Sequence, residues 1–104
     1  MDIVVFKSTM NDAVCDFLLK AFNENRRKID FKTKDSDLLD IQSNYQENGE
    51  FWCAIDWKGD IIGTIGLRKL SDCYEIRRFF VNKKNQGKNI GTELLNTLIE
   101  YAIS

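Results

Sequence analysis

The apolar residues of this chain change their spacing twice, and this change limits the possible folds more than any other feature. Between residues 14 and 22 they recur at the spacing of one helix face, whereas between residues 51 and 81 they alternate as in strands. Helical spacing returns over residues 90–102. Turn residues at 58–60 and 71–72 divide the middle region into three strands that can pair as an antiparallel meander. The sequence therefore predicts an α+β fold with layered helices and strands, in which helices flank the meander.

The expected order of elements is β-α-α-β-β-β-α. A first strand covers residues 2–7, and a helix begins within residues 9–12. A second helix runs from Leu38 to Tyr45 and is closed at Asn48-Gly49 by a residue that tolerates a positive φ angle. The meander strands are expected over 51–57, 61–70 and 74–81, and the last helix over 87–103. The helix side chains expected to face inward are Val14, Phe17, Leu18, Ala21 and Phe22 in the first helix and Ile90, Leu94, Leu95, Leu98, Ile99 and Ala102 in the last. In the first meander strand, the side chains expected to share one face are Phe51, Cys53, Ile55 and Trp57.

Length, composition and charge narrow the class of protein. A chain of 104 residues with 43% hydrophobic and 30% charged residues is expected to form a single domain over residues 1–104. Its net charge of −1 provides no general attraction to nucleic acid or to an anionic membrane. The N-terminus lacks the pattern of a signal peptide, and no apolar run approaches the ~20 residues of a membrane span. These features predict a cytoplasmic protein.

The chain contains no histidine, which excludes Ser-His-Asp and Cys-His catalytic pairs and every histidine-ligated metal site. Its three cysteines, Cys15, Cys53 and Cys73, are far apart and have no Cys-x-x-Cys spacing, so neither a zinc site nor a disulfide framework is indicated. We expect Cys73 to be a packing or strand-end residue and not a nucleophile. No metal is predicted.

The segment most informative about function is residues 82–91, between the last strand and the last helix. A glycine- and asparagine-rich turn into a helix leaves several backbone N–H groups without intrahelical partners. The helix macrodipole adds partial positive charge there, and Gly87 and Gly91 allow a ligand to approach the main chain closely. This arrangement suits a diphosphate.

The charges around this turn support the same interpretation. No acidic residue occurs between Ile76 and Thr92, whereas Arg77, Arg78, Lys83, Lys84 and Lys88 are basic. A multiply phosphorylated ligand would be attracted to such a field. The alternative is an ordinary strand-to-helix connection whose lysines form a solvated surface. The spacing of the residues alone does not decide between this connection and a phosphate-binding turn.

The residues Gln86-Gly87-Lys88-Asn89-Ile90-Gly91 resemble the Gln/Arg-x-x-Gly-x-Gly/Ala signature of the GNAT superfamily of acyl-CoA N-acyltransferases. Asn89 stands where the first glycine of the signature is usual, and asparagine tolerates a left-handed backbone better than most residues. The strand before the signature, beginning at Glu75, also resembles the fourth strand of that family. The resemblance covers the whole chain in the order of its elements.

The resemblance implies acetyl transfer from acetyl-CoA to a primary amine by direct attack, without a covalent enzyme intermediate. The backbone of Phe79, Phe80 and Val81 would pair with the pantetheine arm. The pyrophosphate would lie on Gln86, Gly87, Lys88, Asn89, Ile90 and Gly91. Glu75 matches a position that serves as general base in some members, and its alternative role is an ion pair with a neighbouring basic residue. The acceptor, a small-molecule or peptide amine, is expected near the basic loop at 26–34.

Members of this family usually continue beyond the helix that ends near Ser104, with a fifth strand and further elements. Three interpretations remain open at this point: a fragment of a longer enzyme, a homodimer or strand-swapped dimer that completes the sheet, or a catalytically inactive module that binds CoA or a protein partner. A sheet edge at the fourth strand would favour self-association.

Overall fold

The computed structural model describes residues 1–104 and contains the predicted order of elements. The strands are β1 (Asp2–Val5), β2 (Gly49–Ile55), β3 (Ile61–Lys69) and β4 (Tyr74–Val81), and the helices are α1 (Asn11–Glu24), α2 (Ile41–Tyr45) and α3 (Ile90–Ile103). Short 3-10 turns precede α1 and α2 and follow β4. No helix of the structure combines the length and the apolar character needed to cross a membrane.

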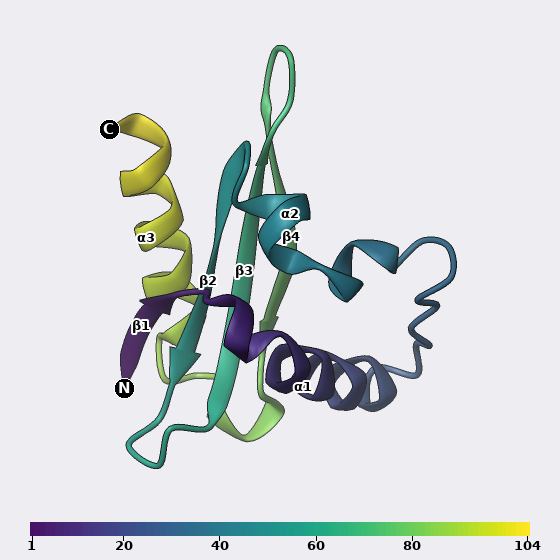
Figure 1. Cartoon of the computed structure of the whole chain (residues 1–104). Coiled ribbons are helices and arrows are strands. Elements are labelled where there is room, and N and C mark those ends of the chain that lie inside the picture. The colour runs from purple at the N-terminus through teal and green to yellow at the C-terminus, as the bar shows by residue number, and fades with distance from the viewer.

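The strands form one antiparallel sheet in the order β1-β2-β3-β4. Figure 1 shows α1 and α2 on one face of this sheet and α3 on the other. The predicted α+β class, with helices flanking a meander, is therefore confirmed. Strand β4 lies at the edge of the sheet, and the loop that leaves it leads directly into α3.

Two apolar cores lie on the two faces of the sheet. The first joins α1 and α2 to the sheet and contains Phe6, Val14, Phe17, Leu18, Leu38, Ile41, Tyr45, Phe51 and Cys53. The second lies under α3 and contains Trp52, Ala54, Ile62, Ile65, Leu67, Ile90, Leu94 and Leu98. Because successive side chains of a strand point to opposite faces, β2 contributes to both cores.

Two predicted side-chain positions were wrong for the same reason. Trp57 lies beyond the end of β2, in the turn to β3, and is 87% exposed. Ile99 lies on the outer side of α3, and only Ile90, Leu94 and Leu98 of that helix are fully buried. In both elements the apolar pattern continues beyond the surface that the sheet can cover. Ile29 and Phe31, in the loop after α1, also pack against the first core.

The second helix is shorter than the sequence indicates. A 3-10 turn at Ser36–Leu39 and the five-residue α2 replace one continuous helix, and the chain leaves helical geometry at Asp40 between them. Gly49 does not close this helix with a positive φ angle; it begins β2. A Cβ atom there would lie 1.9 Å from the carbonyl oxygen of Leu67, so close pairing with β3 requires glycine at this position.

Strand β4 contains a bulge next to the candidate site. Ile65 of β3 faces two residues of β4, Arg78 and Phe79, because the register shifts between Thr64 and Gly66. Arg78 has φ +56°, an unusual conformation for a residue other than glycine. The bulge sends the side chain of Arg78 toward α1 and α2, whereas Phe79 approaches α3.

Candidate functional site: a cradle at the start of helix α3

The turn between β4 and α3 adopts two left-handed residues in close succession. Gly87 has φ +85°, and Asn89 has φ +64° and ψ +15° immediately before the first helical residue. Asparagine is among the residues that adopt this conformation most readily, so the departure from the family signature at position 89 preserves the turn. Helix α3 begins at Ile90 and not at the predicted residue 87, because these two residues interrupt helical geometry.

The N–H groups of residues 87–92 have no hydrogen-bond acceptor within the chain. The first helical bond in this region runs from the N–H of Glu93 to the carbonyl oxygen of Asn89, and no side chain caps the helix. Helix starts normally satisfy some of these donors with a side chain. Here the donors lie at the positive end of a 14-residue helix, which is the arrangement that binds phosphate groups in other proteins.

A hollow of about 270 Å³ lies against these donors and is lined by Val81, Asn85, Gln86, Gly87, Asn89, Ile90, Gly91 and Thr92. We call this hollow and its amides the cradle. The side chain of Gln86 closes one side by donating a hydrogen bond to the carbonyl oxygen of Val81 at 3.2 Å. Asn85 contributes a buried side-chain oxygen that has no hydrogen-bond donor within the chain.

Gly91 brings the first turn of α3 close to β4. A Cβ atom at this position would meet the side chains of Phe79 and Val81 at 3.6 Å, an ordinary contact distance. The glycine is therefore not required for packing within the chain. Its small size leaves the hollow open between the helix start and the strand.

The charges at the cradle differ from the prediction at two arginines. Lys83, Lys84 and Lys88 are exposed around the turn, as expected. Arg78 does not contribute to this field, because its guanidinium is buried on the opposite face of the sheet and paired with two carboxylates. Arg77 also lies away from the cradle, because it lines a groove on the face of the sheet that carries α1.

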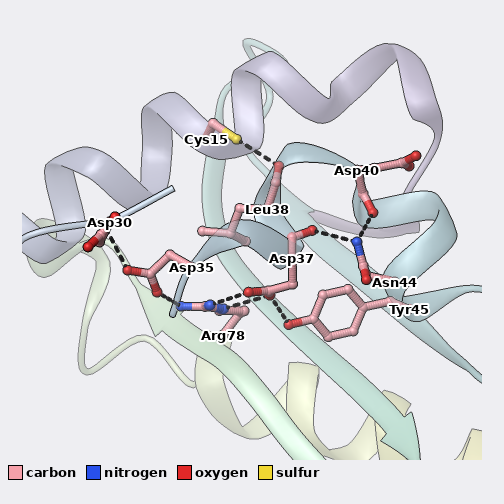
Figure 2. Close-up of polar contacts among 9 residues, drawn as sticks. All are labelled: Cys15, Asp30, Asp35, Asp37, Leu38, Asp40, Asn44, Tyr45 and Arg78. Atoms are coloured by element: carbon pink, nitrogen blue, oxygen red, sulfur yellow. Dashed lines mark hydrogen bonds and ion pairs between the residues drawn. The ribbon is translucent and has the colours of Figure 1, made fainter. Parts of the chain in front are cut away.

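Arg78 forms the centre of a buried ion cluster, shown in Figure 2. It binds Asp35 at 2.8 Å through one nitrogen and Asp37 at 2.6 and 3.1 Å through the other two. The hydroxyl of Tyr45 also donates a hydrogen bond to Asp37. The cluster connects the loop after α1 to the bulge of β4, so it fixes this strand against the segment that covers it.

The environment of the cluster keeps Asp37 and Arg78 charged. Burial opposes ionisation of Asp37, but the hydrogen bonds from Arg78 and Tyr45 outweigh it and lower the pKa of the carboxyl. Burial also opposes the charge of Arg78, and its bonds to Asp37 and Asp35 outweigh this and raise its pKa. Burial and the hydrogen bond to Asp37 together raise the pKa of Tyr45, so its hydroxyl stays protonated and remains a donor.

The second groove, of about 300 Å³, runs along β4 on the face that carries α1. It is lined by Phe22, Arg27, Glu75, Ile76, Arg77, Arg78, Phe79 and Phe80. Glu75 is partly buried and forms no ion pair, even with its cross-strand neighbour Arg68. The alternative that Glu75 serves only as a strand carboxylate in an ion pair is therefore not supported.

The structure divides the predicted site residues between two places. Val81, Gln86, Gly87, Asn89, Ile90 and Gly91 line the cradle, and Lys88 is exposed at its rim. Glu75, Phe79 and Phe80 line the groove. At about 3.3 Å per residue, Glu75 and Val81 lie roughly 20 Å apart along β4. The outer backbone edge of β4, which no strand covers, joins the two places.

Sequence reasoning missed several lining residues. Asn85 and Thr92 border the cradle, and their neighbours in the signature were the only sequence signal for them. Arg27 lines the groove together with Phe22; its loop at 26–34 is where the acceptor is expected, but the sequence does not single out Arg27 within it. A third hollow, of about 430 Å³, lies between α1 and the β2–β3 turn, and none of the predicted site residues lines it.

Comparison with solved structures finds the same architecture in known acetyltransferases. An acetyltransferase of the GNAT family from Staphylococcus aureus is 32% identical, with a TM-score of 0.89 over 95% of this chain and 63% of that one. An acetyltransferase from Streptococcus agalactiae is 20% identical, with a TM-score of 0.84 over 97% of this chain and 65% of that one. An aminoglycoside 6'-N-acetyltransferase complexed with coenzyme A is 21% identical, with a TM-score of 0.73 over 97% of this chain and 54% of that one.

The chain thus spans less than two thirds of the length of each of these three proteins. Comparison with curated protein sequences gives no significant match. The sequence profile of the acetyltransferase (GNAT) family matches residues 11–104, which include both the groove and the cradle. The chain therefore belongs to the GNAT acetyltransferase family.

Proposed function

We propose that the protein is an N-acetyltransferase that binds acetyl-CoA at the cradle and transfers its acetyl group to a primary amine held in the groove along β4. The observation that carries this proposal is the row of unpaired N–H groups at residues 87–92. These donors, the helix macrodipole and three exposed lysines together favour a ligand with adjacent phosphates.

The small residues of the cradle also support binding of the diphosphate of coenzyme A. The absence of a side chain at Gly87 and Gly91 lets phosphate oxygens reach the main-chain donors. None of these donors has to give up a hydrogen bond within the chain in order to bind a ligand. Two related folds, the aminoglycoside 6'-N-acetyltransferase and Rv2747 from Mycobacterium tuberculosis, have been solved with coenzyme A.

The open edge of β4 would hold the pantetheine arm. Its amides can pair with the edge backbone near Phe79 to Val81 as an added strand would, in exchange for the bond from Gln86 to the Val81 carbonyl oxygen. The thioester would then lie close to the bulge, where a backbone N–H group can stabilise the oxygen that becomes negative during attack. The buried cluster around Arg78 keeps the bulge in place for this purpose.

The acceptor amine would attack the thioester carbon as the carbon–sulfur bond breaks and the thiolate of coenzyme A leaves. The attacking nitrogen must lose one proton, and Glu75 is the carboxylate in the groove that can accept it, directly or through water. Positioning and electrostatic stabilisation suffice for this reaction, so the absence of histidine is no obstacle.

The proposal is tested by measuring release of free coenzyme A thiol from acetyl-CoA with a panel of primary amines, together with calorimetric binding of acetyl-CoA. We expect acetyl-CoA to bind and at least one amine to be acetylated, with Glu75→Gln lowering kcat by about 10²-fold or more. Binding without acetylation of any amine would identify an inactive CoA-binding module instead. A failure to bind acetyl-CoA would contradict both functions.

A further inference from the structure

We infer that the acceptor of this protein is a primary amine that also carries an anionic group, bound by Arg27 and Arg77 in the groove beside Glu75. This inference rests on the proposed function, because it names the substrate class of the same site. It is supported by the charged side chains of the groove, some of which are paired within the chain whereas others are not.

Three arginines line the groove, and only one of them is neutralised. Arg78 uses its nitrogens on Asp35 and Asp37. Arg27 and Arg77 have no carboxylate within ion-pair distance and no side-chain hydrogen bond to the protein. Two guanidinium groups in one small groove repel each other unless an anion lies between them. Their donors are arranged in a planar fork that matches a carboxylate or a phosphate.

The position of Arg27 is fixed by aromatic contacts that leave its donors available. Its guanidinium carbon lies 4.4 Å from the ring centroid of Phe22 and 6.0 Å from that of Phe80. These rings are themselves in contact, with centroids 5.2 Å apart. A guanidinium held over an aromatic face keeps the N–H groups at its edge free for a ligand. Arg27 therefore loses little side-chain entropy when it binds an anion.

Arg77 and Glu75 lie two residues apart on β4, so their side chains share one face of the strand. This spacing places a carboxylate and a guanidinium side by side along the groove. An ammonium group would be attracted to Glu75, and a carboxylate or phosphate attached to the same molecule would reach Arg77 and Arg27. A diamine would place its second positive charge against these two arginines, and an uncharged amine would leave their donors unused.

The test is a titration of the isotope-labelled wild-type chain, followed by NMR, with four primary amines. These are 4-aminobutyrate, its amide 4-aminobutanamide, phosphoethanolamine and putrescine. We expect both anionic amines to bind at least about tenfold more tightly than the amide, and putrescine to bind most weakly. Whichever of 4-aminobutyrate and phosphoethanolamine binds more tightly shows whether the groove prefers a carboxylate or a phosphate. Equal binding of the amide, tighter binding of putrescine, or no binding of any amine would overturn the inference.

Three variants distinguish the groove from general surface charge. Arg27→Gln and Arg77→Gln should each weaken binding of the anionic amines by about tenfold and leave binding of the amide unchanged. Arg26→Gln is the matched control, because Arg26 is an exposed neighbour that does not line the groove. A loss of affinity in the control as large as in Arg27→Gln would attribute the preference to the net charge of the loop and overturn the inference.

A parallel titration with acetyl-CoA separates this inference from the proposed function. Binding of acetyl-CoA without preference for anionic amines would reject the acceptor class alone. Arginine-dependent binding of anionic amines without binding of acetyl-CoA would reject the transferase and leave the groove as a binding site for anionic amines.

Discussion

Gly87 and Gly59 share an unusual backbone conformation, but only Gly87 lies in the cradle. Their φ angles are +85° and +87°, and a Cβ atom at either position would meet no other atom within 4 Å. Gly59 belongs to the β2–β3 turn. The two glycines therefore form a matched pair for separating backbone strain from ligand binding.

We predict that Gly87→Glu weakens binding of coenzyme A by at least about tenfold, because the new carboxylate repels the diphosphate. Gly59→Glu should leave this affinity unchanged. Both variants should lose a similar free energy of unfolding, about 1–2 kcal/mol, since each places a side chain at positive φ. Calorimetric titration and urea unfolding provide the two measurements, and an equal loss of affinity in both variants would contradict the assignment of the cradle.

The three cysteines should differ strongly in reactivity toward a thiol reagent. Burial raises the pKa of Cys53 to about 12, and it raises the pKa of Cys15 with help from the charges of Asp12 and Asp16. Cys73 is exposed. We expect Cys73 to react first, Cys15 more slowly and Cys53 only after unfolding, as followed by mass spectrometry at pH 8. Rapid modification of Cys53 in the folded protein would contradict the first core.

Single residues show where sequence reasoning succeeds and where it fails. The left-handed conformation of Asn89 could be predicted, because it depends on the residue itself and its immediate neighbours. The burial of Arg78 could not, because its partners Asp35 and Asp37 lie more than 40 residues away in the sequence. A count of basic residues in a segment does not reveal which of them the fold neutralises.

At the scale of elements, the ion cluster connects β4 to the segment that precedes α2. Asp37 belongs to the 3-10 turn at Ser36–Leu39, which also places Leu38 in the first core, and its carboxylate receives hydrogen bonds from both Arg78 and Tyr45. Removing one member of a buried ion pair leaves the other charge uncompensated, which is more costly than losing an exposed pair.

We predict that Asp37→Asn lowers the free energy of unfolding by about 3 kcal/mol at pH 7. The pKa of Asp37 is lower in the folded state than in the unfolded state, so its contribution is present above the unfolded value near ~4 and is lost as the pH falls through the folded value. The difference between wild type and variant should therefore shrink in acid.

Urea unfolding at several pH values measures this difference. Asp60→Asn is the control, since Asp60 is exposed and forms no ion pair, and its effect should stay within about 0.5 kcal/mol. A constant difference between wild type and Asp37→Asn from neutral pH to strong acid would show that the charge of Asp37 does not stabilise the fold.

The helices and strands were predicted well where the periodic spacing of apolar residues extended over many residues. The alternation over β2 to β4 and the helical spacing in α1 and α3 gave the correct order and nearly the correct bounds. The break at Asp40 escaped prediction because the apolar residues from Leu38 to Tyr45 fit a helix as well as a 3-10 turn followed by a short helix. The sequence also could not show that both faces of β2 are covered, since this depends on where α3 packs.

At the scale of the whole molecule, the sheet is covered on both faces but remains open at β4. The outer edge of this strand has no neighbouring strand, and Tyr74, Ile76 and Phe79 are exposed along it. Unpaired strand edges with apolar side chains tend to recruit another strand. In the proposed enzyme this edge also holds the pantetheine arm.

We predict that the 104-residue chain self-associates through β4, and that coenzyme A competes with this association. Analytical ultracentrifugation over a range of protein concentrations should show dimers that an Ile76→Lys substitution weakens, because the charge would be buried at the contact. A monomer at every concentration would contradict the expected dimer without affecting the assignment of the cradle.

The proposed function depends on the cradle at the start of α3, and the amides of the cradle can be observed directly. The measurement is an NMR titration of the isotope-labelled chain with coenzyme A, which reports on each backbone N–H group separately. The predicted result is that the largest shifts fall on residues 87–92, with smaller shifts along the edge of β4. Saturable binding that leaves the amides of residues 87–92 unchanged would show that coenzyme A does not bind at the cradle.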